Sequence, residues 1–326
     1  HAPCRKGAQT HLFVRGLRQR FYRVVGRHHE RDDPLVAQGL LPHGRGHRNL
    51  LPLALLVVTW RQNVHQVPWP AFWLGESMVN VSALAARPDG GFAALVEVDE
   101  LNGKKRKYLL DSGWSYKWMD ECFKREGIDQ MLKNREIEAL IISHEHFDHY
   151  WGVPVTYKYD PTITTYIPEG FYPEGLQYLQ DAGHKGKVVK VKPGLNSLIP
   201  GLATFVFAVP IICRVYGEQA LYVNVKDQGL VSITGCCHFG IIQFSETAFR
   251  EIKYEKDNLY GIYGGLHISP FEDWDPKYDD LVLSLGKYGF QKIGCNHCTG
   301  VLCAKKFIER GYPVQKGTAR HRSQDP

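Results

Sequence analysis

The sequence predicts an α/β fold. From about residue 74 onward, short strand-like runs alternate with stretches of helical spacing, as expected where helices cover a sheet. One strand-like run, residues 137–142, is apolar except for Glu138 and so predicts a strand buried on both faces. A dense group of histidine and aspartate residues follows it directly. We therefore expect the functional site of the protein at the carboxyl end of this strand.

The first elements of the predicted domain are a hairpin and a helix. Residues 92–98 and 108–110 are β-rich and flank a polar turn that contains Asn102 and Gly103, a pattern that predicts a β-hairpin. Residues 117–134 have the spacing of a helix. The positions of this helix that we expect to face inward are Trp118, Cys122, Met131 and Leu132.

The later elements continue the alternation. Further strands are predicted at residues 162–167, 187–191, 204–209, 220–225 and 230–234. Further helices are predicted at residues 174–181, 244–253, 278–288 and 304–310. Ile262 and Ile293 are expected to end short strands that lead to His267 and His297. The polar residues 316–326 predict a disordered tail.

Residues 1–70 differ in composition from the rest of the chain. They contain ten Arg and one Lys, whereas residues 71–326 contain nine Arg and twenty Lys. Seven of the fifteen His lie in the first 70 residues, and the first Met is Met78. We interpret residues 1–70 as an atypical N-terminal extension that is poorly ordered or not native to the protein; a genuine basic arm is the alternative. Because the formal net charge of +6 is so unevenly spread, it indicates an anionic partner only weakly.

The apolar run at residues 50–60 is too short to cross a bilayer, which takes about 20 residues. It could be the apolar part of a signal peptide, with Arg45 and Arg48 before it, but no small-residue cleavage site follows. We predict a cytoplasmic protein, with export as the alternative. The eight Cys do not suggest a disulfide framework in a chain of 326 residues. Five of them cluster beside His238 and His297, a pattern that fits reduced thiols near a metal.

The segment after the buried strand has the composition of a metal-binding loop. His144, His146, Asp148 and His149 place four potential ligands within six residues. Imidazole and carboxylate groups suit zinc, and also iron or manganese. A loop is required here, because a strand would point alternate side chains to opposite faces. We expect one or two divalent metal ions, most simply Zn²⁺.

This segment, Ser143-His-Glu-His-Phe-Asp-His149, resembles the HxHxDH signature of the metallo-β-lactamase superfamily. Asp111-Ser-Gly113 resembles the Asp-x-Gly segment that precedes the signature in that family. The resemblance covers residues 75–315 and implies a four-layer αββα sandwich with a dinuclear metal site at one edge. It also implies that His144 and His146 bind one metal, and that Asp148 and His149 bind the second.

Three later segments resemble one branch of the superfamily, which includes the archaeal dihydropterin ribofuranosylaminobenzene phosphate synthases. They are residues 232–241, Gly264-Gly-Leu-His267 and Asn296-His-Cys-Thr-Gly300. Most of the superfamily has a bridging aspartate in a Thr-Gly-Asp segment, and Cys236 stands at that position here. A thiolate can bind zinc, although Cys236 could instead be a small core residue beside the site.

The usual third histidine of the first metal has no obvious match. His184 is the only His between the two segments, and its polar, Gly-rich surroundings predict a surface loop. We propose His238 as the replacement ligand; the alternative is a histidine that orients a carboxylate. His297 matches the last histidine of the family. His267 is either a ligand, a proton donor to the leaving group, or a structural residue after the Gly-Gly turn.

These features predict a metal-dependent hydrolase of the superfamily. A metal-activated hydroxide is expected to attack an ester-type substrate, either an anionic phosphate or sulfate ester or a lactone or carboxyl ester. Asp148 is expected to bind metal and to orient the nucleophile, so that we count Asp148 and His267 as catalytic candidates. Lysines at 185, 187, 190 and 192 could bind an anion or simply be solvated. The aromatic residues 150, 151, 171, 172 and 178 could line a pocket or pack in the core.

Two rival functions stay open. One is a pterin-pathway phosphate synthase, and the other is a non-catalytic metal- or redox-sensing module that uses Cys236, Cys237 and Cys295. The expected partner is a small-molecule substrate, with neither nucleic acid nor membrane. The Arg-rich residues 1–70 are the only feature that favours nucleic acid. The natural substrate and the oligomeric state do not follow from the residues.

Overall fold

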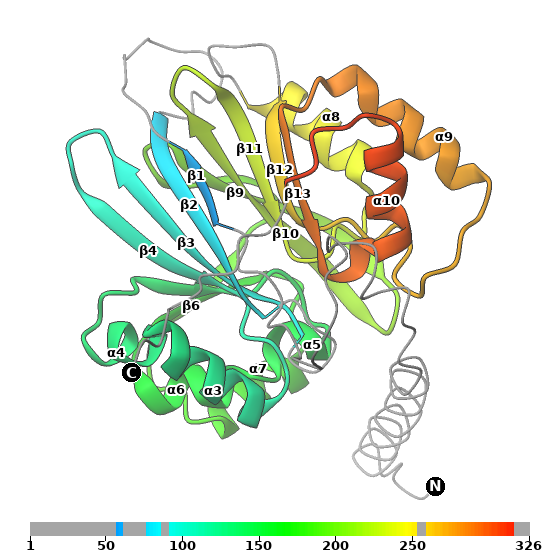
Figure 1. Ribbon diagram of the computed structural model, residues 1–326. Coiled ribbons are helices and arrows are strands. Elements are labelled where there is room, and N and C mark those ends of the chain that lie inside the picture. Colours follow the sequence, from blue (N-terminus) through cyan, green and yellow to red (C-terminus); the bar gives the residue numbers. More distant parts are fainter. Residues whose placement is uncertain (1–56, 61–75, 86–90, 253–258, 316–326) are drawn as a thin grey trace, which may run out of the picture. The chain divides into compact units, whose positions relative to one another are not determined.

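The computed structural model describes residues 57–60, 76–85, 91–252 and 259–315 (Figure 1). The chain divides into two units, His1–Leu50 and Leu51–Pro326, and all described residues belong to the second. Of the predicted extension, residues 57–60 form a strand within the second unit, and the other residues up to 70 lie outside the described ranges, as does the predicted tail. The extension and the tail therefore stay predictions. No described helix is both long and apolar enough to cross a membrane.

The described strands form one continuous sheet that branches at a long strand, β10 (Val215–Val225). In the first half of the sheet, the strands from β1 to β4 pair antiparallel with their neighbours, and those from β4 to β7 pair in parallel. Its strands are β1 (Val57–Trp60), β2 (Glu76–Ala85), β3 (Ala93–Glu100), β4 (Lys105–Leu110), β5 (Ala139–Ile141), β6 (Thr164–Pro168) and β7 (Val188–Val191). The predicted hairpin at residues 92–110 and the buried strand before His144 are confirmed.

The second half of the sheet is joined to the first where β10 pairs in parallel with β2. Its first four strands are antiparallel neighbours, and its last three are parallel. Besides β10, its strands are β8 (Gly194–Ile199), β9 (Leu202–Ile211), β11 (Gly229–Thr234), β12 (Leu259–Gly265) and β13 (Lys292–Asn296). The sequence patterns did not indicate β8, because its residues are only half-buried and do not alternate clearly.

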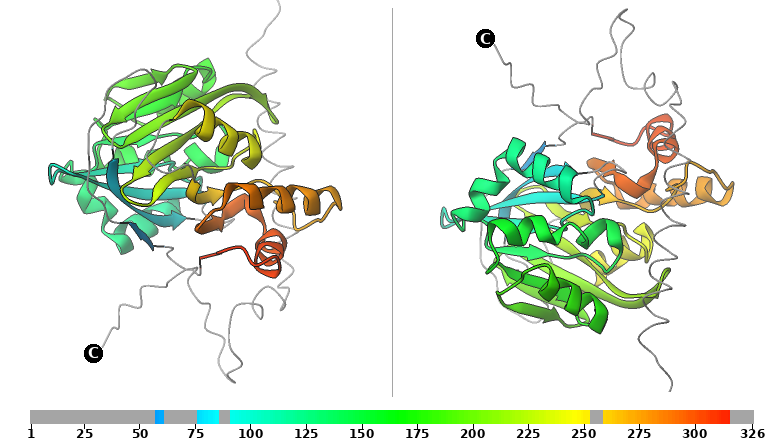
Figure 2. Two further views of the ribbon diagram at one scale, coloured as in Figure 1. Left: turned by 90° about the horizontal axis from the view of Figure 1, so that it is seen from above. Right: turned by 90° about the horizontal axis from the view of Figure 1, so that it is seen from below.

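Helices cover both outer faces of the branched sheet (Figure 2). Those that follow strands of the first half are α3 (Tyr116–Glu126), α4 (Ile128–Lys133), α5 (Phe147–Tyr150), α6 (Val153–Tyr159) and α7 (Pro173–Asp181). Those that follow strands of the second half are α8 (Ile241–Glu251), α9 (Lys277–Ser284) with the 3-10 turn η1 (Leu285–Tyr288), η2 (His297–Thr299) and α10 (Val301–Glu309).

The alternation of side chains along the strands produces three apolar layers. On β3, Ala94, Val96 and Val98 pack between the two sheet halves, whereas Ala93 and Leu95 face the helices. On β10, the residues that pack between the halves are Leu221, Val223 and Val225, and those that face the other helices are Ala220 and Tyr222. Such period-two burial on both halves yields the layer order helix, sheet, sheet, helix. The predicted αββα sandwich is confirmed.

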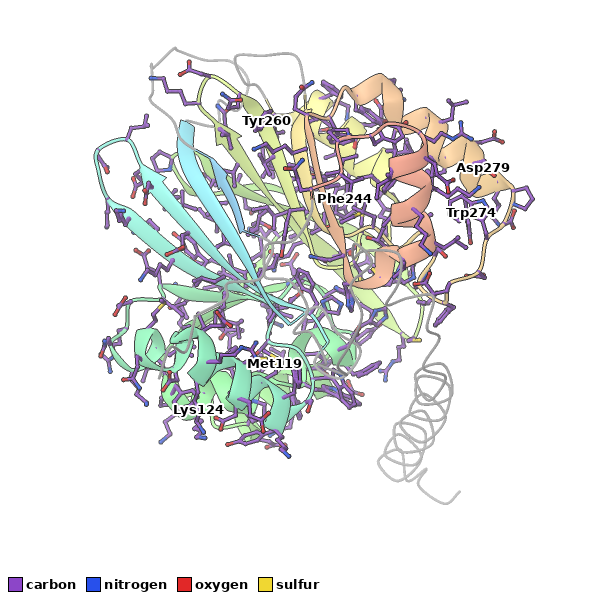
Figure 3. The ribbon with its side chains drawn as sticks, viewed as in Figure 1. Met119, Lys124, Phe244, Tyr260, Trp274 and Asp279 are labelled. Atoms are coloured by element: carbon purple, nitrogen blue, oxygen red, sulfur yellow. The ribbon has the colours of Figure 1, made fainter. Side chains whose placement is uncertain are left out.

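The predicted helix at residues 117–134 is two helices rather than one. Gly127 adopts a left-handed φ of 74° and forms the C-cap of α3, and α4 starts after it in a new direction. Figure 3 shows Met119 on the side of α3 that faces the sheet and Lys124 on the opposite side. Cys122 and Leu132 are buried as predicted, while Trp118 and Met131 are only partly buried.

Candidate metal centre

The predicted ligands lie where parallel strands end at one edge of the sheet. Strands β4 and β5 end before Asp111 and His144, and β11, β12 and β13 end before Cys236, His267 and His297. Because β4 and β5 are parallel, and β11, β12 and β13 are parallel, their carboxyl ends lie together within each group. Segments far apart in the sequence therefore meet at one site.

The backbone is strained where four of these strands turn into the site. Asp111, Cys237, His267 and His297 have φ angles of 62°, 66°, 44° and 48°. Left-handed conformations are uncommon for residues other than glycine and cost about 1–3 kcal/mol each. Strain of this kind persists where the surrounding structure holds it, and it clusters at functional sites. Here it turns the side chains that follow each strand toward the same space.

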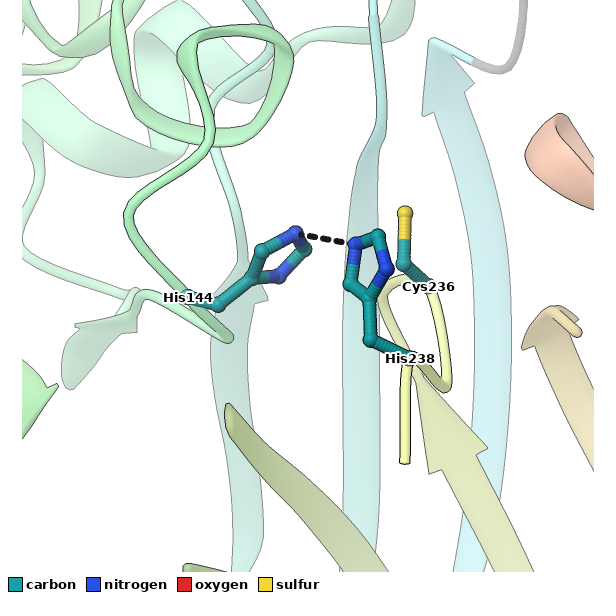
Figure 4. A group of neighbouring side chains, drawn as sticks. All are labelled: His144, Cys236 and His238. Atoms are coloured by element: carbon teal, nitrogen blue, oxygen red, sulfur yellow. Dashed lines mark hydrogen bonds between the residues drawn. The ribbon is translucent and has the colours of Figure 1, made fainter. Parts of the chain in front are cut away.

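His144, His146 and His238 form the first group of candidate ligands. Nε2 of His144 lies 3.0 Å from Nδ1 of His146 and 3.2 Å from Nε2 of His238. Figure 4 shows a ring nitrogen of His144 directed at a ring nitrogen of His238, with Cys236 beside His238. The predicted replacement of the missing third histidine by His238 thus has the required geometry, because the loop after β11 brings it to the metal-binding loop.

Hydrogen bonds select the ring nitrogen that each of two histidines presents to this group. The hydroxyl of Ser143 donates to Asp111 at 2.7 Å, so that its oxygen accepts from Nδ1–H of His144 at 2.8 Å. Nε2–H of His146 donates to the carbonyl oxygen of Ile212 at 2.9 Å. Each ring therefore keeps a lone pair on the nitrogen that points into the group, which is the form that binds a metal.

Asp148, His149 and His297 form the second group. Oδ2 of Asp148 lies 3.2 Å from Nε2 of His297 and 3.8 Å from Nε2 of His149. Nδ1 of His149 donates to Asp111 at 2.7 Å, which leaves Nε2 free to accept. That atom lies 3.0 Å from Sγ of Cys236. The structure brings all the predicted ligands of the second metal together.

Cys236 lies between the two groups. Its sulfur belongs to three sets of side chains in which the possible ligand atoms all lie within 4.8 Å of one another. Two of these sets are His144 with His238, and His149 with His297; the third is His267 with Cys298. The thiol thus has the position of a bridging group. His267 packs against His238, with ring centroids 4.1 Å apart.

The electrostatics of the pocket favour neutral imidazoles in the first group. Burial lowers the pKa of His144, His146 and His238, and the neighbouring histidines lower those of His144 and His238 further. Burial by itself would raise the pKa of Asp148, but its interaction with His149 and the hydrogen bond from His297 lower it well below its ordinary value. At neutral pH the first group therefore offers neutral imidazoles, and the carboxylate of Asp148 beside it is ionised.

These donors fit a divalent metal ion. At a tetrahedral metal with bonds of about 2.0–2.1 Å to nitrogen, two ligand nitrogens lie about 3.3–3.4 Å apart. The separations of 3.0 and 3.2 Å around Nε2 of His144 are close to that value. Nitrogen lone pairs directed at one another repel without a cation between them, so the arrangement of the first group is that of a ligand set.

Sequence reasoning missed two residues of this site. Cys298 was counted only among the five cysteines that cluster beside His238 and His297 and was not named as a ligand, yet its sulfur lies beside Cys236 and His267. Glu218 is fully buried on β10 and accepts the backbone N–H groups of Cys237 at 2.7 Å and Phe239 at 3.3 Å. Glu218 is the only charged residue of β10, and this was the available signal.

The other residues that the sequence suggested for a site make contacts that the packing of the fold explains. Nε2 of His184 contacts the carbonyl oxygen of Ile163 at 2.8 Å, and its ring packs on Tyr157. Tyr150 and Phe171 are buried in the layer beneath the helices. The lysines at 185, 187, 190 and 192 are exposed on and around β7, which ends the strand order of its sheet half. Exposed lysines protect such an edge from further strand pairing.

Comparisons with known proteins agree with this geometry. The family model of the metallo-beta-lactamase superfamily matches residues 86–215. The 7,8-dihydropterin-6-methyl-4-(beta-D-ribofuranosyl)-aminobenzene-5'-phosphate synthase of Methanocaldococcus jannaschii is 22% identical over 260 residues, which cover 67% of this chain and 84% of that protein.

Two solved structures are similar to this chain, and the first has the same fold. A crystal structure of a metal-dependent hydrolase of the beta-lactamase superfamily superposes with a TM-score of 0.54 at 19% identity, covering 74% of this chain and 96% of the other. The metallo-beta-lactamase fold protein YhfI from Bacillus subtilis gives a TM-score of 0.47 at 14% identity, covering 70% and 90%.

The fold and the site define an αββα sandwich with a histidine-rich metal centre at one edge of its sheet. Residues 86–215 match the metallo-β-lactamase superfamily, and the fold around them is similar to that of solved members. Members of this superfamily typically bind divalent metal ions.

Proposed function

We propose that the protein is a metal-dependent hydrolase of ester-type substrates. The observation that carries the proposal is the convergence of His144, His146 and His238 with Asp148, His149 and His297 around one cysteine sulfur. Two adjacent ligand sets of this kind suit a pair of metal ions. Divalent metal ions held there would supply a nucleophilic water at neutral pH and stabilise negative charge on a substrate oxygen.

The residues around the ligands hold them in one arrangement. Asp111 fixes the ring of His149 directly and that of His144 through Ser143. Asp148 is ionised and partly exposed, so it can both bind metal and accept a hydrogen bond from an attacking water. His267 was predicted as a ligand, a proton donor or a structural residue after the Gly-Gly turn. Its position beside Cys236 and Cys298 favours the role of ligand.

Residues next to the ligands support an anionic ester with an apolar part. Ile212, whose carbonyl oxygen binds His146, has a side chain that is 62% exposed, and Phe239, which follows His238, is 41% exposed. The exposed guanidinium of Arg214 lies two residues from Ile212 and stacks on Tyr172. Arginine binds phosphate, sulfate and carboxylate groups well. We therefore propose a small-molecule ester that presents an anionic group to Arg214.

Metal analysis combined with a panel of chromogenic esters tests the function. The panel contains phosphate mono- and diesters, sulfate esters, lactones and a lactam. We expect turnover of at least one ester class, loss of turnover with a chelator, and recovery with Zn²⁺ or Mn²⁺. The double variant His146→Ala/Asp148→Ala should lose turnover and bound metal together. Full activity in the presence of a chelator would contradict the metal mechanism.

A matched control removes a histidine outside the site. His184 packs against Tyr157 and bonds to the backbone, so that His184→Gln should keep both metal content and turnover. If His184→Gln and the double variant lose activity alike while metal content stays unchanged, the loss reflects folding and not the site. Arg214→Ala should weaken binding of anionic esters, seen as a higher KM, with little change for neutral lactones.

A synthase activity is the second candidate. It is favoured by the relative from Methanocaldococcus jannaschii, which bears the name of a phosphate synthase and is matched over 84% of its length. Incubation with a dihydropterin precursor and a phosphorylated aryl amine would release phosphate or pyrophosphate if the chain joins them. Release that depends on both substrates would favour the synthase over the hydrolase.

A further inference from the structure

A cluster of soft ligands lies beside the histidine-rich groups and shares only Cys236 with them. The cluster consists of the sulfur atoms of Cys236 and Cys298 and a ring nitrogen of His267, all within 4.8 Å of one another. Cys236 and Cys298 are 3% and 9% exposed. The buried Nδ1 of His267 has no hydrogen-bond partner among the described residues. Two thiols and an imidazole in one buried space differ in kind from the imidazole and carboxylate groups of the neighbouring sets.

The backbone around the cluster is shaped to bring Cys298 close. Gly265 lies at the end of β12, and a Cβ atom at this position would be 2.7 Å from the sulfur of Cys298. The thiol of Cys298 donates to the carbonyl oxygen of Cys236 at 3.4 Å. A side chain at residue 265 would push the two cysteines apart. The absence of a side chain there is thus what allows the sulfur of Cys298 to approach the loop of Cys236.

Hydrogen bonds clamp the two segments that carry His267 and Cys298. The backbone N–H of Leu266 donates to the hydroxyl of Thr299 at 3.0 Å, and that of Ser269 donates to the carbonyl oxygen of Thr299 at 3.1 Å. The two donors lie on either side of His267, and both bonds end on Thr299, the residue after Cys298. His267 and Cys298 therefore keep their relative position without a metal, and such preorganisation favours binding.

We propose that Cys236, His267 and Cys298 form a separate, thiolate-rich site for a thiophilic metal ion of the Zn²⁺ class. Soft thiolate ligands select zinc, cadmium and monovalent copper over the harder Mg²⁺, Ca²⁺ and Mn²⁺. Binding releases one proton from each thiol to solvent and forms two sulfur–metal bonds. The site shares Cys236 with the centre of the proposed function, so that occupancy of the thiolate-rich site competes with any bridging role of that sulfur.

Cobalt and cadmium are probes that report on this site without enzymatic activity. The metal-free full chain is titrated with Co²⁺, and the sulfur-to-cobalt charge-transfer absorption in the near ultraviolet is recorded, with bound Cd²⁺ counted in parallel. We expect one ion per chain with two thiolate ligands. Cys298→Ala should lower the charge-transfer absorption to half or less and remove one equivalent of tightly bound Cd²⁺.

The matched control is Cys295→Ala. Cys295 belongs to the same Cys-x-x-Cys segment but to none of the three sets of candidate ligands, so this variant should bind both probes as the unchanged protein does. A Cys298→Ala variant that binds the same number of ions with the same absorption would overturn the proposal. Equal losses in the two variants would overturn it as well.

A third variant separates this proposal from the proposed function. His146→Ala removes a ligand of the histidine-rich set that the thiolate-rich cluster does not use. We expect it to lose turnover and one metal equivalent while it keeps the two-thiolate absorption. If the unchanged protein and every variant lack turnover while the absorption is intact, the hydrolase proposal is wrong and the thiolate-rich site is still supported.

Discussion

Nδ1 of His149 lies 2.7 Å from Oδ2 of Asp111, and both side chains are fully buried. The same carboxylate accepts the hydroxyl of Ser143, which in turn bonds to His144. One aspartate thus orients a candidate ligand in each of the two groups. We expect Asp111→Asn to weaken metal binding about 10–100-fold, because an amide nitrogen facing Nδ1 opposes the required tautomer. Asparagine tolerates the φ of 62° at this position, so that the fold should persist.

Competition of the variant against a chromogenic chelator measures this change in affinity. Asp160→Asn is the control, since Asp160 is also buried but accepts the backbone N–H of Thr162 away from the site. Unchanged affinity in Asp111→Asn would show that the carboxylate does not set the ligand geometry.

Glu218 links the stability of the metal-free protein to pH. Burial raises its pKa to about 8, although N–H groups of Phe239 and Cys237 oppose the shift. The pKa in the folded state is thus above the unfolded value of about 4.3. The contribution of Glu218 to the stability of the fold is fully present at pH values below that unfolded pKa, and it is lost as the pH rises toward 8. Glu218→Gln should remove this loss, which amounts to several kcal/mol in the unchanged protein.

Denaturant unfolding of metal-free protein at a series of pH values between 4 and 9 tests the effect. The difference in unfolding free energy between Glu218→Gln and the unchanged chain should vary with pH and favour the variant most at high pH. A difference that is constant across the range would refute the assignment. Glu218→Ala should also lower metal affinity, because the loop that carries His238 loses its acceptor.

Asp120 has the opposite pH dependence. Burial raises its pKa, but hydrogen bonds from Lys124, Lys158 and Tyr159 outweigh burial and lower it well below its ordinary value. A carboxylate whose pKa is lower in the folded state than its unfolded value of about 3.9 stabilises the fold at pH values above about 3.9. This stabilisation is lost as the pH falls through the folded-state pKa. Asp120→Asn should therefore destabilise the protein by about 1 kcal/mol at pH 7, because the lysines are largely exposed.

Thermal or denaturant unfolding at pH 7 and at pH 2 measures this effect, with Glu126→Gln on the same helix as the control. Glu126 pairs with the adjacent, exposed Arg125, so its removal should change stability little at either pH. The prediction fails if the deficit of Asp120→Asn is as large at pH 2 as at pH 7.

Gly152 permits the close approach of the metal-binding loop to the Asp-Ser-Gly turn. Its N–H donates to the carbonyl oxygen of Gly113 at 2.8 Å, and a Cβ atom would overlap the carbonyl oxygen of Ser112. Gly152→Ala must displace backbone, and we expect it to destabilise the protein by about 3 kcal/mol or more and to lower metal affinity. Gly127→Ala, at a left-handed position with open space around it, should cost only about 1 kcal/mol. Equal costs in denaturant unfolding would contradict this ranking.

Much of the fold follows from local patterns. The alternation in β3 and the uninterrupted apolar run of β5 identified both strands, since burial on one or both faces leaves a direct trace in the residue order. Helices α5 and α6 were missed because they are short, and α5 includes Asp148 and His149, which the sequence analysis expected in a loop. Their apolar residues then pack as a helix through contacts made elsewhere in the chain.

The amino-acid sequence by itself determined the ligand loop at His144 to His149 and the α/β class, because both depend on residues that are close together in the chain. The tertiary structure alone decided that His238 lies 3.2 Å from His144 and that Cys298 lies beside Cys236. Those pairs are separated by many residues and meet only because parallel strands end at one edge of the sheet. The spacing of these residues along the sequence does not predict that they lie close together, because their proximity results from the register and direction of the strands.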